Sequence, residues 1–169
     1  MIPVRIMFTK GKNPFSKLIM WGLDEPISHV AICFFDAFVV HSNIKGLNIT
    51  SLDAFREHSN IVFEHEIARY SRSQTVMKMR ELGKDIDRAG YDWKYFCFLF
   101  WEALKSKIMR RELKINGVHH DKNKYLCLEV AEKYLNMHVR YDKDLYATPM
   151  KMYELIKKEE SPSGNFSET

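Results

Sequence analysis

The chain has 169 residues, of which 46% are hydrophobic and 28% are charged, and this composition fits one globular domain with a hydrophobic core. Its formal net charge of +4 comes from scattered lysine and arginine residues, which argues against a dedicated nucleic-acid-binding surface. Three widely spaced cysteines without a CxxC motif indicate neither a disulfide framework nor a structural zinc site, and nothing in the pattern predicts a cofactor.

The first half of the chain is predicted to contain most of the strands. Only Asp36 separates the second and third apolar runs as a turn residue, so we expect these two strands to form a hairpin. Pro14 suits the first position of a helix over residues 14–22, and Ser51 caps a second short helix. The predicted strands cover residues 2–8, 29–35, 37–41, 47–50 and 61–67.

The second half is predicted to be mostly helical. Residues 91–108 are apolar on nearly every face, which predicts a largely buried helix. Because the predicted strands lie mostly in the first half of the chain and the helices mostly in the second, the order of elements indicates the α+β class. We expect one domain over residues 1–160 and a disordered tail over residues 161–169. The predicted helices cover residues 73–82, 91–108, 126–135 and 149–158, and polar residues 110–124 are expected to form a loop or a small hairpin.

No segment is predicted to cross a membrane. The first ten residues lack the apolar run of a signal peptide, and the most apolar stretch, residues 95–104, is about half the length that a membrane span needs. We expect a soluble protein of a reducing compartment, without stable membrane insertion. No feature of the sequence sets its oligomeric state.

Cys127 is the candidate nucleophile. It lies near the start of a predicted helix, where backbone N–H groups and the helix dipole stabilise a thiolate and lower the pKa of the thiol. The same N–H groups could hold the oxyanion that forms during acyl transfer. The alternative is a buried structural cysteine, which is the commoner environment of a free cysteine.

His29 and His41 are the candidate base and its partner. They lie 12 residues apart, and a hairpin that turns at Asp36 brings both to the end opposite the turn. One imidazole can then orient the other, as in a catalytic triad. The alternative is a pair of solvent-facing histidines.

A zinc site is a further alternative for the same residues. His29, His41 and Cys127 are all zinc ligands by type, but no short-range ligand pair supports a metal site, and we expect none. Cys33 and Cys97 lie inside apolar runs and are predicted to belong to the core.

Five short segments form a pattern that extends beyond the candidate triad: residues 15–21 (FSKLIMW), 28–32 (SHVAI), 40–42 (VHS), 90–93 (GYDW) and 125–130 (YLCLEV). In this order and spacing, they resemble the circularly permuted members of the NlpC-type cysteine peptidase superfamily. Two departures are Ala31, where the family has glycine, and Leu128, where it has serine.

The resemblance spans residues 2–135 and implies a permuted papain-like fold, with a small antiparallel sheet packed against helices. It is permuted because the histidine strand precedes the cysteine helix. The resemblance implies a triad of Cys127 as nucleophile, His29 as base and His41 as the third member. We assign Tyr91, Tyr125 and Glu129, which lie in the matching segments, as candidate substrate-binding residues.

The implied activity is that of a cysteine hydrolase that forms a thioester acyl-enzyme. Amide bonds in cell-wall peptides, including peptidoglycan fragments, are the leading expected substrate. A lipid-directed thiol esterase or acyltransferase is the alternative, as is a non-catalytic binding module on the same fold. A cell-wall enzyme without a signal peptide would need another delivery route, so we expect a cytoplasmic or phage-associated protein.

Overall fold

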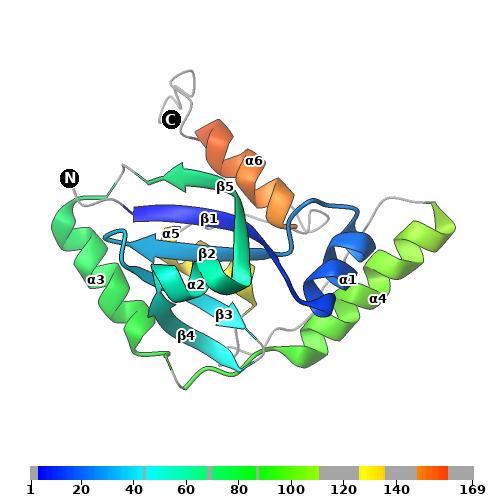
Figure 1. The fold of residues 1–169 in the computed structure, drawn as a ribbon, viewed down its shortest axis with the longest axis horizontal. Coiled ribbons are helices and arrows are strands. Elements are labelled where there is room, and N and C mark those ends of the chain that lie inside the picture. Colours follow the sequence, from blue (N-terminus) through cyan, green and yellow to red (C-terminus); the bar gives the residue numbers. More distant parts are fainter. Residues whose placement is uncertain are drawn as a thin grey trace, which may run out of the picture.

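Five strands form one antiparallel sheet in the order β4-β3-β2-β1-β5 (Figure 1). The computed structural model describes residues 4–43, 45–67, 70–86, 88–110, 126–135 and 148–159. The strands are β1 (Val4–Gly11), β2 (His29–Phe34), β3 (Phe38–Asn43), β4 (Gly46–Ser51) and β5 (Ser59–Glu66).

Helices surround this sheet, and the α+β class predicted from the sequence is confirmed. Every predicted helix and strand is present, with boundaries shifted by a few residues. The helices are α1 (Pro14–Leu23), α2 (Leu52–His58), α3 (Arg72–Gly83), α4 (Trp93–Met109), α5 (Cys127–Leu135) and α6 (Pro149–Glu159).

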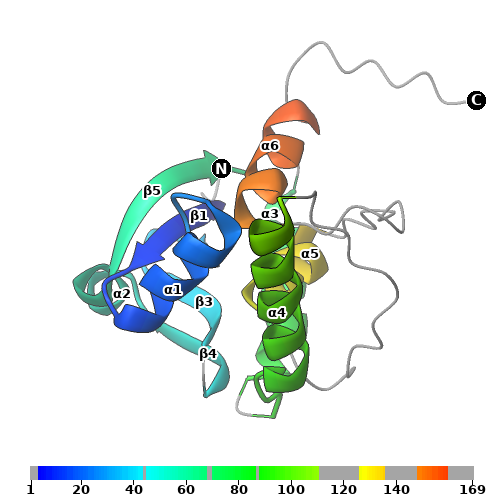
Figure 2. The same cartoon turned by 90° about the vertical axis from the view of Figure 1, so that its right-hand side faces the viewer.

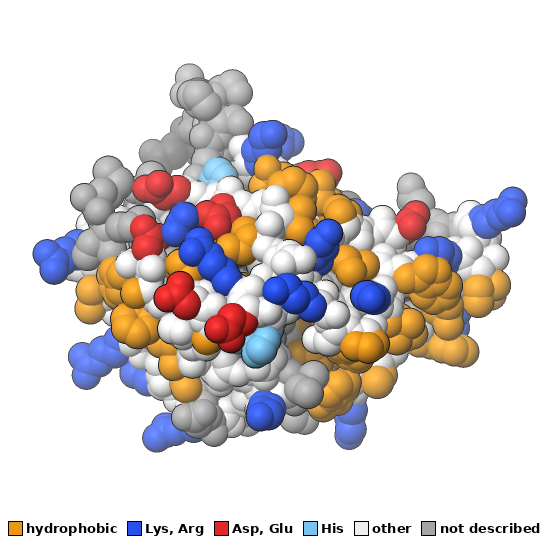
Figure 3. Space-filling view, viewed as in Figure 1, with side chains coloured by type: hydrophobic (Ala, Val, Ile, Leu, Met, Phe, Trp, Pro, Cys, Tyr) orange, Lys and Arg blue, Asp and Glu red, His pale blue; other side chains and the backbone are white. Residues whose placement is uncertain are grey.

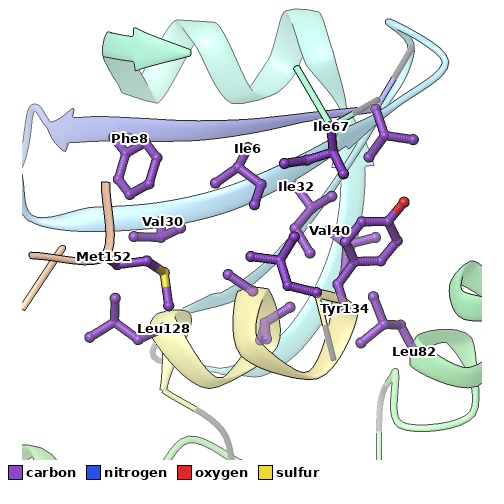
Figure 4. Close-up of a cluster of buried hydrophobic side chains, with 14 of the residues drawn as sticks. Ile6, Phe8, Val30, Ile32, Val40, Ile67, Leu82, Leu128, Tyr134 and Met152 are labelled. Atoms are coloured by element: carbon purple, nitrogen blue, oxygen red, sulfur yellow. The ribbon is translucent and has the colours of Figure 1, made fainter. Parts of the chain in front are cut away.

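The two faces of the sheet carry separate hydrophobic clusters, because successive strand residues point to opposite sides. Helix α2 covers one face, and α5 and α6 lie against the other (Figures 1 and 2). Figure 4 shows the larger cluster, in which Leu128 and Tyr134 of α5 lie beneath strand residues such as Phe8 and Ile32. Apolar packing against opposite faces of the sheet therefore holds α2 and α5 in place.

The hairpin between β2 and β3 turns as expected. Phe35 and Asp36 have φ values of 59° and 54°, the left-handed conformation that tight hairpin turns require. Pairing between the two strands covers only three positions, from Ile32 opposite Val40 to Phe34 opposite Phe38. Beyond those positions β2 stays paired with β1 and β3 with β4, so the sheet opens between β2 and β3 at the end away from the turn.

The expectation that residues 91–108 form a largely buried helix is wrong. Helix α4 packs beside α1 at one end of the molecule rather than under the sheet (Figures 1 and 2), so only part of its surface is covered. Trp101 is 55% exposed and Ile108 71% exposed. Cys97, predicted to be a core residue, is exposed, whereas Cys33 is buried as predicted.

Two predicted segments lie outside the described residues: most of the polar loop or small hairpin over 110–124, and the tail over 161–169. None of the helices described is long and apolar enough to cross a membrane.

Candidate active site

The two candidate histidines contact each other at the open end of the β2–β3 hairpin. Nε2 of His29 lies 3.1 Å from Nδ1 of His41, so one ring donates a hydrogen bond to the other. When His29 is the donor, its second ring nitrogen, Nδ1, carries the lone pair that a general base needs. The contact expected from the hairpin spacing is present.

Phe55 of α2 packs against both imidazoles. Its ring centroid lies 6.3 Å from that of His29 and 5.1 Å from that of His41. The two imidazole planes are inclined at 83° to each other. The apolar ring therefore restricts the orientation of both histidines and removes water from one side of the pair.

Cys127 is the first residue of α5, which lies against the opposite face of the sheet from Phe55. The backbone N–H groups of Val30, Leu128 and Cys127 itself lie close enough to its sulfur to lower the pKa of the thiol. Because Val30 follows His29 directly in β2, the sulfur lies beside the histidine strand at the place where the sheet opens. The first N–H groups of a helix have no partner within the helix, so those of Cys127 and Leu128 can act on the sulfur.

Burial keeps the three candidate triad members uncharged. Burial raises the pKa of the Cys127 thiol to about 11, although the three backbone N–H groups oppose this shift. Burial and the neighbouring His41 lower the pKa of His29 to about 3, and burial lowers the pKa of His41 to about 4. The backbone N–H groups at the helix start do lower the pKa of Cys127, but desolvation of the thiolate outweighs them, so the expectation of a net lowered pKa is wrong.

A pocket of about 500 Å³ joins these residues, since His29, His41 and Cys127 all line it. One part of its wall is apolar and includes Phe15, Ile19 and Phe55. The rest is mostly neutral and polar, and the described lining residues include no Asp, Glu, Lys or Arg. Further neutral polar residues that line the pocket are Asn13, Ser16, Ser28, Ser42, Asn43, Asn48, Thr50 and Ser59.

The three candidate substrate-binding residues have different positions. Tyr91 lines the pocket, and burial together with the nearby Cys127 raises the pKa of its phenol well above the usual value. The Glu129 carboxylate accepts a hydrogen bond of 2.6 Å from the backbone N–H of Leu126, which caps the start of α5. Glu129 is not among the described lining residues. Tyr125 lies outside the described residues.

The neutral polar wall of the pocket could not be predicted from the sequence. Asn13 is the N-cap of α1, where its side chain accepts a hydrogen bond from Ser16, and Asn48 lies on the edge strand β4. His58, at the end of α2, also lines the pocket. These residues come from separate loops and strands, so no sequence spacing links them before the sheet is formed.

Among the described residues, no group of three or more His, Cys, Asp or Glu side chains is arranged to hold a metal ion. The zinc alternative for His29, His41 and Cys127 therefore gains no support from the geometry. Comparison of the chain with protein-family models, with curated proteins and with solved structures gives no match.

Proposed function

We propose that the protein is a cysteine hydrolase or acyltransferase in which Cys127 attacks the carbonyl carbon of an amide or ester. The observation that carries the proposal is the joint placement of a helix-start cysteine and a hydrogen-bonded histidine pair on one pocket. The antiparallel sheet with a cysteine helix against it also fits the permuted papain-like fold that the sequence resembles.

In the proposed first step, His29 removes the thiol proton of Cys127 as the sulfur attacks the substrate carbonyl. Because Cys127 and His29 are both neutral at rest, proton transfer accompanies attack and does not precede it. His41 orients the imidazole of His29 and shares the positive charge that forms on it.

The carbonyl oxygen becomes an oxyanion in this step. The backbone N–H groups of Cys127 and Leu128 at the start of α5 are the donors we assign to it, since both act on the sulfur and lower the pKa of its thiol. Collapse of the tetrahedral intermediate expels the amine or alcohol, which takes the proton from His29. A thioester on Cys127 remains, and water or a second nucleophile then releases the acyl group.

Peptide amides, with cell-wall peptides first, remain the proposed substrate class on the sequence resemblance. The described pocket wall lacks formal charges, which favours substrates whose groups beside the scissile carbonyl are also uncharged. Stem peptides of cell walls carry carboxylates, whereas the acyl esters of lipids do not, so this wall is the observation that favours a lipid ester as the second candidate.

Acyl-enzyme trapping tests the proposal. The protein is incubated with peptide amides, peptidoglycan fragments and phospholipid esters, and intact mass spectrometry records covalent adducts. We expect an acyl adduct on Cys127 with one of these classes, absent from Cys127→Ala and retained in Cys97→Ser, which removes the exposed cysteine. Binding of a substrate by the wild type and Cys127→Ala alike, without adduct or turnover, would instead establish a non-catalytic binding module.

A further inference from the structure

All three tryptophans of the chain lie exposed at one end of the molecule, on α1 and α4. Trp21 is 53% exposed, Trp93 42% and Trp101 55%. Tryptophan has a large, mainly apolar side chain with one polar N–H. The solvent exposure of all three tryptophans therefore needs an explanation. Together with the exposed Leu18, Ile108 and Met109 they form what we call the α1–α4 surface.

The exposed side chains of α4 follow helical spacing. Trp93, Cys97, Trp101 and Ile108 are separated by four, four and seven residues, which places them on one stripe along the helix. All four are exposed. Because α1 packs beside α4, the stripe adjoins a second helix that also exposes apolar side chains (Figure 2). Figure 3 shows hydrophobic side chains gathered at this end of the molecule, with basic side chains at their margins.

Positive charge surrounds the apolar side chains. Nζ of Lys107 lies 4.9 Å from the ring centroid of Trp21, and Nζ of Lys105 lies 5.6 Å from that of Trp101. Residues 14–24 and 93–110 contain two acidic groups, Asp24, paired with Lys107, and Glu102, paired with Lys105. The same ranges contain five cationic residues, so their net charge is 5 − 2 = +3. Two acidic residues flank these ranges: Asp92 is buried and Glu25 is half-buried. The cationic residues are Lys17, Lys94, Lys105, Lys107 and Arg110.

The α1–α4 surface adjoins the candidate active-site pocket. The ring centroid of Trp93 lies 5.7 Å from that of Phe15 and 5.1 Å from that of Tyr91, and both of these residues line the pocket. A molecule held on the α1–α4 surface would therefore lie close to the uncharged pocket wall.

We propose that the α1–α4 surface docks peripherally on an anionic phospholipid bilayer. Tryptophan is enriched at the depth of lipid headgroups because its ring enters the apolar region while its N–H stays hydrated. Lysine and arginine beside it neutralise anionic headgroups, and their stems pack along the apolar side chains. Charge complementarity therefore selects a bilayer over a second copy of this chain, whose matching surface would be equally positive.

Intrinsic fluorescence and vesicle sedimentation test the proposal with the full chain. Phosphatidylcholine vesicles are compared with vesicles that also contain phosphatidylglycerol. We expect cosedimentation and a blue shift of tryptophan emission with the anionic vesicles. Both signals should fall in about 1 M salt, where the Debye length is about 3 Å. The Cys127→Ala variant should bind equally well, so docking is measured independently of the proposed catalysis.

Matched variants locate the contact. Trp21→Ser/Trp101→Ser should abolish most binding, whereas Val76→Ser/Met77→Ser, which removes two apolar side chains of similar exposure from α3, should leave it unchanged. Lys17→Gln/Lys94→Gln should weaken binding about 25-fold, at about fivefold for each cation removed. Circular dichroism confirms that each variant is folded.

Three results would overturn the proposal. The first is absence of binding to anionic vesicles by the wild type. The second is equal loss of binding in the α1–α4 and α3 variants. The third is wild-type self-association, lost in Trp21→Ser/Trp101→Ser, without vesicle binding, which would identify the surface as an interface between copies of the chain.

Discussion

Nε2 of His29 lies 3.1 Å from Nδ1 of His41, and this hydrogen bond joins two strands at the point where their backbone pairing has ended. The side-chain contact holds the open end of the hairpin at a defined separation. It also ties the orientation of the proposed base to a second strand, so changes at His41 should act through His29.

We therefore predict that His41 is a positioning residue. His29→Ala and Cys127→Ala should each reduce kcat by about 10³-fold or more, whereas His41→Ala should reduce it by about 10²-fold. His41→Asn keeps a hydrogen-bonding side chain and should recover part of the loss. Steady-state kinetics on the substrate identified by acyl-enzyme trapping would measure these effects. Equal losses in His41→Ala and His41→Asn would contradict a role in orientation.

The pH dependence of catalysis should show a broad plateau. His29 must be neutral to accept a proton, and its lowered pKa of about 3 keeps it neutral above about pH 5. Cys127 stays protonated up to its raised pKa of about 11, so the attacking pair keeps one form through the neutral range. We expect kcat/KM to be constant between about pH 5 and pH 9. A change in kcat/KM centred near the ordinary histidine pKa of about 6.5 would contradict a neutral His29 beside a protonated Cys127.

The half-buried histidines His29 and His41 should make the fold sensitive to acid. Both have folded-state pKa values below the unfolded value of 6.5, so the unfolded chain binds more protons as the pH falls from 6.5 towards 3. Stability is therefore present above pH 6.5 and is lost through this window. After allowance for partial exposure, we expect the free energy of unfolding to fall by about 3 kcal/mol between pH 7 and pH 4.

Urea denaturation at a series of pH values measures this loss. His29→Gln/His41→Gln removes both titrating groups and should flatten the curve over the same window. His58→Gln, which removes a pocket histidine outside the hydrogen-bonded pair, is the matched control and should retain the slope. A slope that persists in the double variant would assign the acid sensitivity to other groups.

The three cysteines should differ in their rates of alkylation. Exposed Cys97 should react first at pH 8, and buried Cys33, whose pKa is raised by burial, should stay unmodified in the folded protein. Cys127 should react slowly at pH 8 and faster towards pH 11. Mass spectrometry of digested protein reads each site separately. Rapid alkylation of Cys127 at pH 6 that slows in His29→Ala would show a preformed thiolate–imidazolium pair instead.

Gly46 should be essential for β4, the strand that forms part of the pocket wall. Gly46 begins β4 with a φ of 109°, and a Cβ atom there would lie 2.3 Å from the carbonyl oxygen of Ala89. Gly46→Ala should therefore destabilise the protein by about 2 kcal/mol or more. A Cβ atom added at Gly83, at the end of α3, would have no described neighbour within 4 Å, so Gly83→Ala should leave stability nearly unchanged. Thermal unfolding of both variants would compare them directly.

The elements of the fold could be predicted from the sequence because their signals are local. Pro14 marks the start of α1, Ser51 caps α2, and Asp36 lies in the hairpin turn, each acting within a few residues of its own position. The proximity of His29 and His41 was also local information, since a hairpin relates residues on either side of its turn by simple counting. The proposed roles of these residues stay predictions.

Long-range packing decided the rest. A helix with apolar residues on nearly every face predicts burial, yet α4 is covered by α1 on only part of its surface and exposes Trp93 and Trp101. The pKa of Cys127 depends on two opposing effects: the helix start, which the sequence showed, and desolvation, which exists only once α5 packs against the sheet. Charge state and exposure depend on neighbours distant in the chain, so only the tertiary structure could determine them.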